Sequence, residues 1–176
     1  MIHSIIKAGD RLSSMTGLVG ASLVVPLALV MGYEVIARFV FDWPTFWAYE
    51  IAWMMTGAHF ALGIGWVTLT KRHVRVDFFY ARMSRRQQAT VDLIVNAGFV
   101  LPCMAWVSSL LIRFAWDAWV KGEVSGESAW NPLVWPINTA IAFGFVVFSV
   151  QLFAEVLRDA LIALGGEPVP AEGEKQ

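Results

Sequence analysis

Four long apolar segments, almost free of charged residues, limit the folds that are open to this chain. A helix needs about 20 consecutive apolar residues to cross the hydrocarbon core of a bilayer. Only 15% of the 176 residues are charged, whereas soluble domains usually carry about 25%. We therefore expect an all-α membrane protein in which residues 1–164 form one transmembrane domain of four helices. These helices should cover residues 15–36, 47–70, 89–116 and 132–157.

The segments that flank these spans indicate how the chain meets the membrane surface. Residues 1–13 place apolar and charged side chains on opposite helical faces, which predicts a short interfacial helix. They do not resemble a cleavable signal peptide. Residues 76–83 are aromatic and amphipathic between basic neighbours, so we expect an interfacial helix between the second and third spans. The Gly-, Pro- and Glu-rich residues 165–176 are typical of a disordered tail.

Two local signals concern the helices themselves. Pro26 lies near the middle of the first span and predicts a kink, because proline cannot donate a backbone hydrogen bond. Ser84 and Gln87 have the spacing of a capping box, which predicts that the third membrane helix starts at about Arg85.

The distribution of basic residues predicts the orientation of the chain in the membrane. Ten of the 13 Lys and Arg residues fall in residues 1–13, 71–88 and beyond 157, all on one side of the expected bundle. Cytoplasmic segments carry such an excess, so both termini should be cytoplasmic. Tryptophan marks the opposite boundary as an aromatic belt, formed by Trp43, Trp47, Trp116, Trp119, Trp130 and Trp135.

Three charged residues lie close to the turn between the first two spans. Arg38 and Glu50 are each six residues from Pro44, so an antiparallel hairpin places them at equal depth. Glu34 precedes Arg38 by one helical turn, in the favourable acid-first order. We expect Glu34, Arg38 and Glu50 to form a structural ion cluster near the outer boundary. A proton or ion relay is the alternative, but it needs ionisable groups at successive depths.

A stripe of small residues runs along the second span. Gly57, Ala61 and Gly65 recur at every fourth residue, and such stripes let membrane helices approach closely. The stripe serves either packing within the subunit or docking of another membrane protein.

The sequence lacks the patterns that catalytic and cofactor sites require. His59 is the one histidine within an expected span, which is insufficient for haem held between two axial histidines. Cys103 is the single cysteine and lies in an apolar run. We find no nucleophile–base pair, phosphate loop or metal-ligand spacing, and the net charge of −1 gives no reason to expect nucleic acid binding. We therefore expect no enzyme, cofactor or metal site.

Three classes of membrane protein remain to be compared. A stand-alone small homo-oligomeric transporter with four spans would need Glu34 as its binding carboxylate, but that residue lies too near the outer edge. A membrane anchor subunit of a respiratory complex would hold haem or quinone, and the two axial histidines that haem needs are lacking in the expected spans. An accessory subunit of a larger transporter requires neither, and we favour it.

An ordered set of motifs then suggests a family. Arg38 precedes an aromatic-rich turn, Trp47 and Glu50 form a Trp-x-x-Glu pattern, and the set ends with Gly63, His73 and Asp77. In this the chain resembles the DctQ-like small membrane subunit of tripartite ATP-independent periplasmic (TRAP) transporters. Glu34 departs from the family pattern, which often has an uncharged polar residue there.

The resemblance implies partners and a function in the bacterial inner membrane, among its lipids. Such a subunit pairs with a large membrane subunit that carries the transport machinery. A periplasmic binding protein delivers the substrate, typically an organic acid anion, and an ion gradient, usually of sodium, drives uptake. The small subunit would be a non-catalytic scaffold, with Glu123 and Glu127 in its outer loop as candidate contacts for the periplasmic partner.

Overall fold

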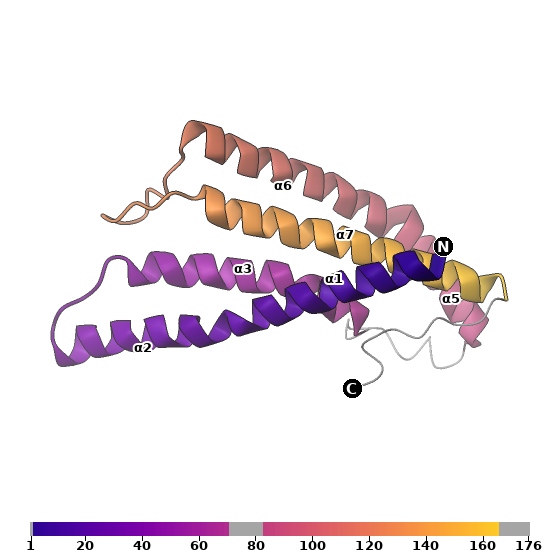
Figure 1. The fold of residues 1–176 in the computed structure, drawn as a ribbon, viewed down its shortest axis with the longest axis horizontal. Coiled ribbons are helices and arrows are strands. Elements are labelled where there is room, and N and C mark those ends of the chain that lie inside the picture. The colour runs from indigo at the N-terminus through magenta and orange to yellow at the C-terminus, as the bar shows by residue number, and fades with distance from the viewer. Residues whose placement is uncertain (1, 71–82, 166–176) are drawn as a thin grey trace.

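The structure is a computed structural model that describes residues 2–70 and 83–165 (Figure 1). This part of the chain is helical and contains no strand, apart from an isolated bridge between Val124 and Leu133. The expected all-α class is therefore confirmed. The elements, in chain order, are α1 (Ile2–Ser22), α2 (Val24–Val40), α3 (Ala48–Leu69), α5 (Arg85–Val95), the π-helix η1 (Asn96–Val100), α6 (Leu101–Lys121) and α7 (Trp135–Ala163).

Some predictions concern segments that lie outside the described residues. They are the interfacial helix at 76–83, the motif residues His73 and Asp77, and the tail from 165 except for Gly165.

Helices α1 and α2 form one long stretch that is interrupted at Leu23. Pro26 explains the break, because its ring conflicts with the carbonyl one turn earlier and it has no N–H to donate. The backbone N–H of Leu23 donates instead to Gly20, at 3.1 Å. The separate interfacial helix expected at residues 1–13 is wrong, since α1 continues without interruption from Ile2 to Ser22.

The third helical stretch starts with a side-chain cap and contains a π-turn. Ser84 and Gln87 form a capping box, which confirms the predicted start of α5 at Arg85. The π-helix η1 ends immediately before α6, whose second residue is Pro102. A proline inside a helix removes one backbone bond and crowds the preceding turn. Widening that turn to a π-helix accommodates the ring, as π-bulges commonly do.

Small residues let α1, α3 and α7 approach one another closely. A Cβ atom added at Gly144 of α7 would lie 2.3 Å from the carbonyl oxygen of Ala61 in α3. One added at Gly17 of α1 would lie 2.5 Å from the Cβ of Trp66. Within the expected stripe, Gly57 faces Ile137 of α7, and Gly65 faces Ser13 and Val147. In the described chain the stripe therefore packs inside the subunit.

The two ends of the bundle differ in what they contain (Figure 1). The start of α1, α5 and the end of α7 lie at one end, which we call the α5 end. The turn 41–47 and the loop 122–134 lie at the other end, which we call the loop end. This arrangement follows from short connections between long antiparallel helices.

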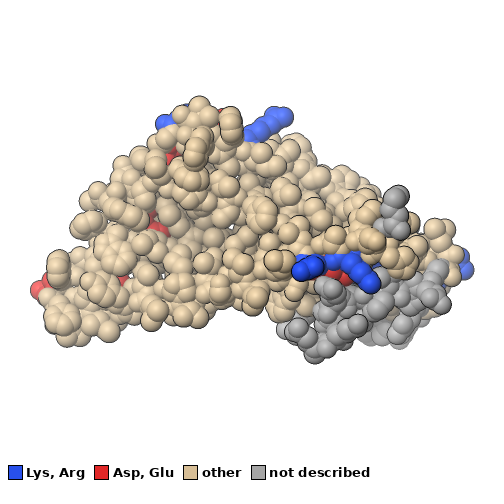
Figure 2. Space-filling view, in the orientation of Figure 1, with Lys and Arg blue, Asp and Glu red and all other residues tan. Residues whose placement is uncertain are grey.

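Within the described residues, three helical stretches are long and apolar enough to cross a membrane, namely Ile2–Val40, Arg86–Lys121 and Trp135–Ala163. Helix α3 was expected to be a further span and is not among them; it carries Glu50, His59 and several glycines. Large apolar side chains cover the outside, and Phe39 is 79% and Leu18 74% exposed. Figure 2 shows this surface, on which charged side chains are sparse.

Candidate functional site

Glu34 connects the turn 41–47 to α2 through hydrogen bonds and an ion pair. The Nε of Arg38 donates to Oε1 of Glu34 at 2.9 Å, and Nη2 forms an ion pair with the same oxygen. The backbone N–H of Thr45 donates to Oε2 at 3.0 Å, and the Thr45 hydroxyl donates to that oxygen as well. Both carboxylate oxygens are therefore engaged, one by the helix and one by the turn. A stacked contact between Tyr33 and Trp47 closes the same turn, with ring centroids 5.7 Å apart.

Glu50 belongs to a second, separate site at the same end. Its side chain is fully buried in the first turn of α3. The hydroxyl of Ser125 donates to Oε1 at 2.6 Å, and Nε1 of Trp53 donates to Oε2 at 3.2 Å. Glu50 thus holds the loop 122–134 against the start of α3. A carboxylate in the first turn of a helix is also favoured by the helix dipole.

The three-residue cluster predicted from the sequence is therefore not formed. The structure brings Glu34 and Arg38 together, whereas no ion pair in the described chain links Arg38 with Glu50. Equal distance from a turn sets equal depth, but it does not set the direction in which a side chain leaves its helix. Glu50 leaves α3 toward the loop 122–134, away from α2.

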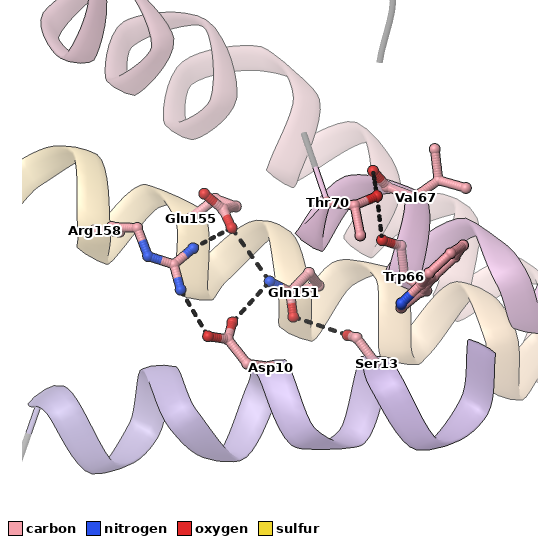
Figure 3. A network of polar contacts seen from close by, with 8 residues as sticks. All are labelled: Asp10, Ser13, Trp66, Val67, Thr70, Gln151, Glu155 and Arg158. Atoms are coloured by element: carbon pink, nitrogen blue, oxygen red, sulfur yellow. Dashed lines mark hydrogen bonds and ion pairs between the residues drawn. The ribbon is translucent and has the colours of Figure 1, made fainter. Parts of the chain in front are cut away.

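A cluster of five buried polar side chains lies at the α5 end, between α1 and α7 (Figure 3). We call it the α1–α7 network; its members are Asp10 and Ser13 from α1 and Gln151, Glu155 and Arg158 from α7. Asp10, Ser13, Gln151 and Arg158 are each at most 2% exposed. Charged side chains are almost never this buried unless they are paired.

Arg158 joins the two carboxylates of the network. Its Nη2 donates to Oδ2 of Asp10 at 2.8 Å, and its Nη1 forms an ion pair with Glu155. Gln151 completes the set, because its Nε2 donates to Asp10 at 3.0 Å and to Glu155 at 3.3 Å. Its Oε1 accepts a hydrogen bond of 2.8 Å from Ser13. The network therefore fixes the position of α1 along α7.

This network was not predicted from the sequence, although the sequence contains a signal for it. Gln151, Glu155 and Arg158 are spaced by four and three residues, so they share one face of α7. Asp10 and Ser13 likewise share a face of α1 with Gly9, where a Cβ atom would lie 3.2 Å from Ala154. Polar and small residues at helical spacing on two apolar helices indicate a buried polar contact. The expectation that the charged side chains of residues 1–13 lie on an exposed helical face is therefore wrong for Asp10, which is 1% exposed.

His59 makes a hydrogen bond at the break between α1 and α2. Its Nδ1 lies 2.8 Å from the carbonyl oxygen of Gly20. A carbonyl only accepts, so Nδ1 carries the proton. The described residues contain no group of three His, Cys, Asp or Glu side chains that could hold a metal ion.

The loop 122–134 presents acidic residues beside a shallow hollow. Hydrogen bonds across the loop give it a hairpin shape, among them Ser125 N–H to the carbonyl of Pro132 at 2.9 Å. Glu123 lies 3.7 Å from Lys121. Glu127 is exposed and lines a hollow of about 410 Å³ together with Tyr49, Trp53, Ser125 and Val134.

Apart from Arg38, the family motif residues that the structure describes lie on α3 or immediately before it. Trp47 precedes the helix, Glu50 is in its first turn, and Gly63 is in its second half. A Cβ atom added at Gly63 would have no neighbour within 4 Å. Unlike Gly65, Gly63 is thus not required for packing inside the described chain.

Comparison with protein families finds a match that covers most of the chain. Residues 27–161 match the family described as tripartite ATP-independent periplasmic transporters, DctQ component. The matched region extends from α2 to the end of α7 and so includes Glu34, Arg38, Glu50 and three members of the α1–α7 network. Comparison with curated proteins and with solved structures finds no match. The chain belongs to the DctQ family, the small membrane component of the TRAP transporters.

Proposed function

We propose that this chain is a non-catalytic scaffold subunit that braces the large membrane subunit of a TRAP transporter. The complete transporter would take up an organic acid anion that a periplasmic binding protein delivers, driven by an ion gradient, usually of sodium. This chain would contribute rigidity and a defined depth in the membrane, while substrate specificity would belong to the other two components.

One observation carries this proposal. The buried carboxylates at both ends of the bundle have internal partners: Asp10 and Glu155 bind Arg158 and Gln151, Glu34 binds Arg38 and Thr45, and Glu50 binds Ser125 and Trp53. A transporter keeps charged groups at its midplane available for substrate or ions. Here Asp10 joins α1 to α7, Glu34 joins α2 to the turn 41–47, and Glu50 joins α3 to the loop 122–134, as expected of a brace.

We further propose that the subunit crosses the bacterial inner membrane four times, with α3 as the additional span and both termini in the cytoplasm. Helix α3 has 22 residues, which suffices for the thickness of the hydrocarbon core. It packs against α1, α2 and α7, so its polar residues are shielded from lipid. The excess of Lys and Arg at the α5 end favours that end as the cytoplasmic one.

Co-purification and transport assays test the scaffold role. We expect the chain to co-purify with the large membrane subunit, and we expect flux only when both subunits and the binding protein are present. The chain alone in liposomes should give no flux. Flux from the chain alone, or a stable transport-competent assembly without a larger partner, would contradict the proposal and favour a stand-alone transporter.

The loop 122–134 is our proposed contact for the binding protein. Glu127 is exposed beside a hollow and Glu123 lies nearby, so a basic patch on the partner would fit them. We predict that Glu127→Lys, alone or with Glu123→Lys, lowers the transport rate at limiting binding protein. At saturating binding protein the rate should recover. Asp117→Lys makes the same charge change on α6, and an equal effect of that control would dismiss a specific contact.

A further inference from the structure

Two basic residues on α1 are exposed and have no acidic partner in the described chain. Lys7 and Arg11 lie one helical turn apart, so their side chains are neighbours on the same face of the helix. Neither forms an ion pair with another described residue. Asp10 is the acid nearest to them in sequence, but it points into the bundle and binds Arg158 and Gln151. Figure 2 shows basic side chains gathered over α1 on the visible face.

The α1–α7 network explains why this pair remains available. Asp10 follows Lys7 by three residues and would ordinarily neutralise it on a helix surface. Instead, the carboxylate is about 1% exposed and committed to α7. The buried pair therefore leaves two positive charges on the outer side of α1 without a counter-ion among the described residues.

An apolar surface continues from the basic pair on the same face of α1. Leu18 follows Arg11 by seven residues, which is two turns or about 10 Å along the axis. It is 74% exposed, and Met15 beside it is 59% exposed. Both belong to the stretch Ile2–Val40, which is long and apolar enough to cross a membrane. Along α1, the basic side chains are thus followed by apolar ones, in the same order as the headgroup and the acyl chains of a phospholipid.

We infer that Lys7 and Arg11 bind the phosphate headgroup of one anionic phospholipid, whose acyl chains lie along Met15 and Leu18. Arg can bind phosphate oxygens with two parallel hydrogen bonds, and Lys adds a point charge. An anionic lipid fits better than a zwitterionic one, because the described residues offer no free acid beside the pair to receive the ammonium group of a choline headgroup. The inference rests on the membrane insertion that the proposed function assumes.

Native mass spectrometry of the full chain in detergent tests the site, with phosphatidylglycerol and phosphatidylcholine as the probes. The wild-type chain should retain one phosphatidylglycerol in preference to phosphatidylcholine. Removing both charges with Lys7→Gln and Arg11→Gln should weaken phosphatidylglycerol binding about thirtyfold, and Lys7→Gln alone about fivefold. Arg113→Gln with Lys121→Gln removes the same two residue types from α6 and should leave binding unchanged.

Several results would overturn the inference. Equal retention of the two lipids by the wild-type chain, or equal losses in the two double variants, would show that the charges act nonspecifically. A rise of Tm with inorganic phosphate as large as that with phosphatidylglycerol would assign the pair to soluble phosphate. Because binding is measured on this chain alone, failure here is distinguishable from failure to co-purify with the large subunit. If the double variant with Lys7→Gln and Arg11→Gln does not fold, lipid binding by Lys7→Gln alone still tests the inference.

Discussion

At the scale of single residues, the burial of Arg158 has both an energetic cost and a gain in specificity. Removing an arginine and two carboxylates from water costs several kcal/mol for each ion, and the ion pairs offset this cost only when hydrogen bonding is complete. Gln151 and Ser13 supply the remaining bonds in the α1–α7 network. The gain is specificity: α1 can slide along α7 only by separating Arg158 from Asp10.

Arg158→Ala is therefore expected to be among the most damaging single substitutions in the described chain. It would leave Asp10 and Glu155 buried without a cation, and breaking such a pair typically costs about 3–5 kcal/mol. Thermal or chemical unfolding of the purified subunit measures the loss. Arg158→Lys should recover part of it, because one ammonium group cannot reach both carboxylates as the guanidinium does.

The exposed pair at the other end of the molecule gives the control for Arg158. Lys121 lies 3.7 Å from Glu123, and both side chains are more than a third exposed. Solvent-exposed ion pairs are worth at most about 1 kcal/mol. Lys121→Ala should accordingly change stability little. Equal losses for Arg158→Ala and Lys121→Ala would show that the α1–α7 network does not stabilise the fold.

Ser125→Ala tests the link between Glu50 and the loop 122–134. Without the hydroxyl, Glu50 loses the 2.6 Å hydrogen bond that holds the loop to α3. We expect faster backbone hydrogen exchange in residues 122–134 and little change in α6 and α7. Ser109→Ala removes a serine whose hydroxyl only bonds the carbonyl of Trp106 within its own helix. Exchange rates in the loop that are the same in both variants would count against the link.

At the scale of elements, the packing of α7 against α3 depends on glycine at one crossing. The backbone of Gly144 approaches Ala61 so closely that a Cβ atom would overlap its carbonyl oxygen. Because the contact is made by backbone atoms of both helices, no flexible side chain can move aside to make room for a Cβ atom. The stripe formed by Gly57, Ala61 and Gly65 is the other half of this contact.

We predict that Gly144→Ala destabilises the subunit by about 1–3 kcal/mol, the usual range for an overpacked core. Unfolding of the purified subunit measures the effect, and cysteine cross-linking between α3 and α7 would report their separation. Gly32→Ala in α2 is the control, because a Cβ atom there has no neighbour within 4 Å. That variant should be neutral or slightly stabilising, since alanine favours a helix over glycine. A stable Gly144→Ala subunit would contradict the close crossing.

The elements were more predictable than their contacts, for a physical reason. Apolar run length, Pro26 and the Ser84 capping box are local signals, and the long helices, the break and the start of α5 follow from them. The partner of Glu50 depends instead on where the distant loop 122–134 folds back. Residue spacing within the hairpin of α2 and α3 holds no information about the position of that loop. Asp10 was misplaced because a charged residue near a chain end resembles a surface residue until its partner on α7 is known.

At the scale of the whole molecule, polar structure is concentrated at the two ends of an apolar bundle. Glu34 and Glu50 organise the loop end, and the α1–α7 network organises the α5 end. Between them, contacts are made by apolar and small side chains, together with isolated hydrogen bonds such as Ser108 to Ser149 at 3.0 Å. Polar contacts at both ends should restrict tilting of the helices, which agrees with the proposed role as a brace.

This distribution leads to a prediction about orientation. If the α5 end is cytoplasmic, a membrane-impermeant maleimide applied to spheroplasts should label Glu127→Cys and leave Ser4→Cys unlabelled. Both residues are exposed, so the membrane alone should decide access. The native Cys103 is the single cysteine and is replaced by serine in both variants.

Permeabilised cells provide the control, because both positions should then react. The reverse pattern would place the α5 end outside and would remove the basis for assigning the loop 122–134 to the periplasm. Labelling of both positions in intact spheroplasts would mean that the two ends face the same side, which is incompatible with an antiparallel bundle that crosses the membrane. The expected pattern would support α3 as the fourth span, since α1 and α2 reach the loop end and the chain must return to the α5 end through α3.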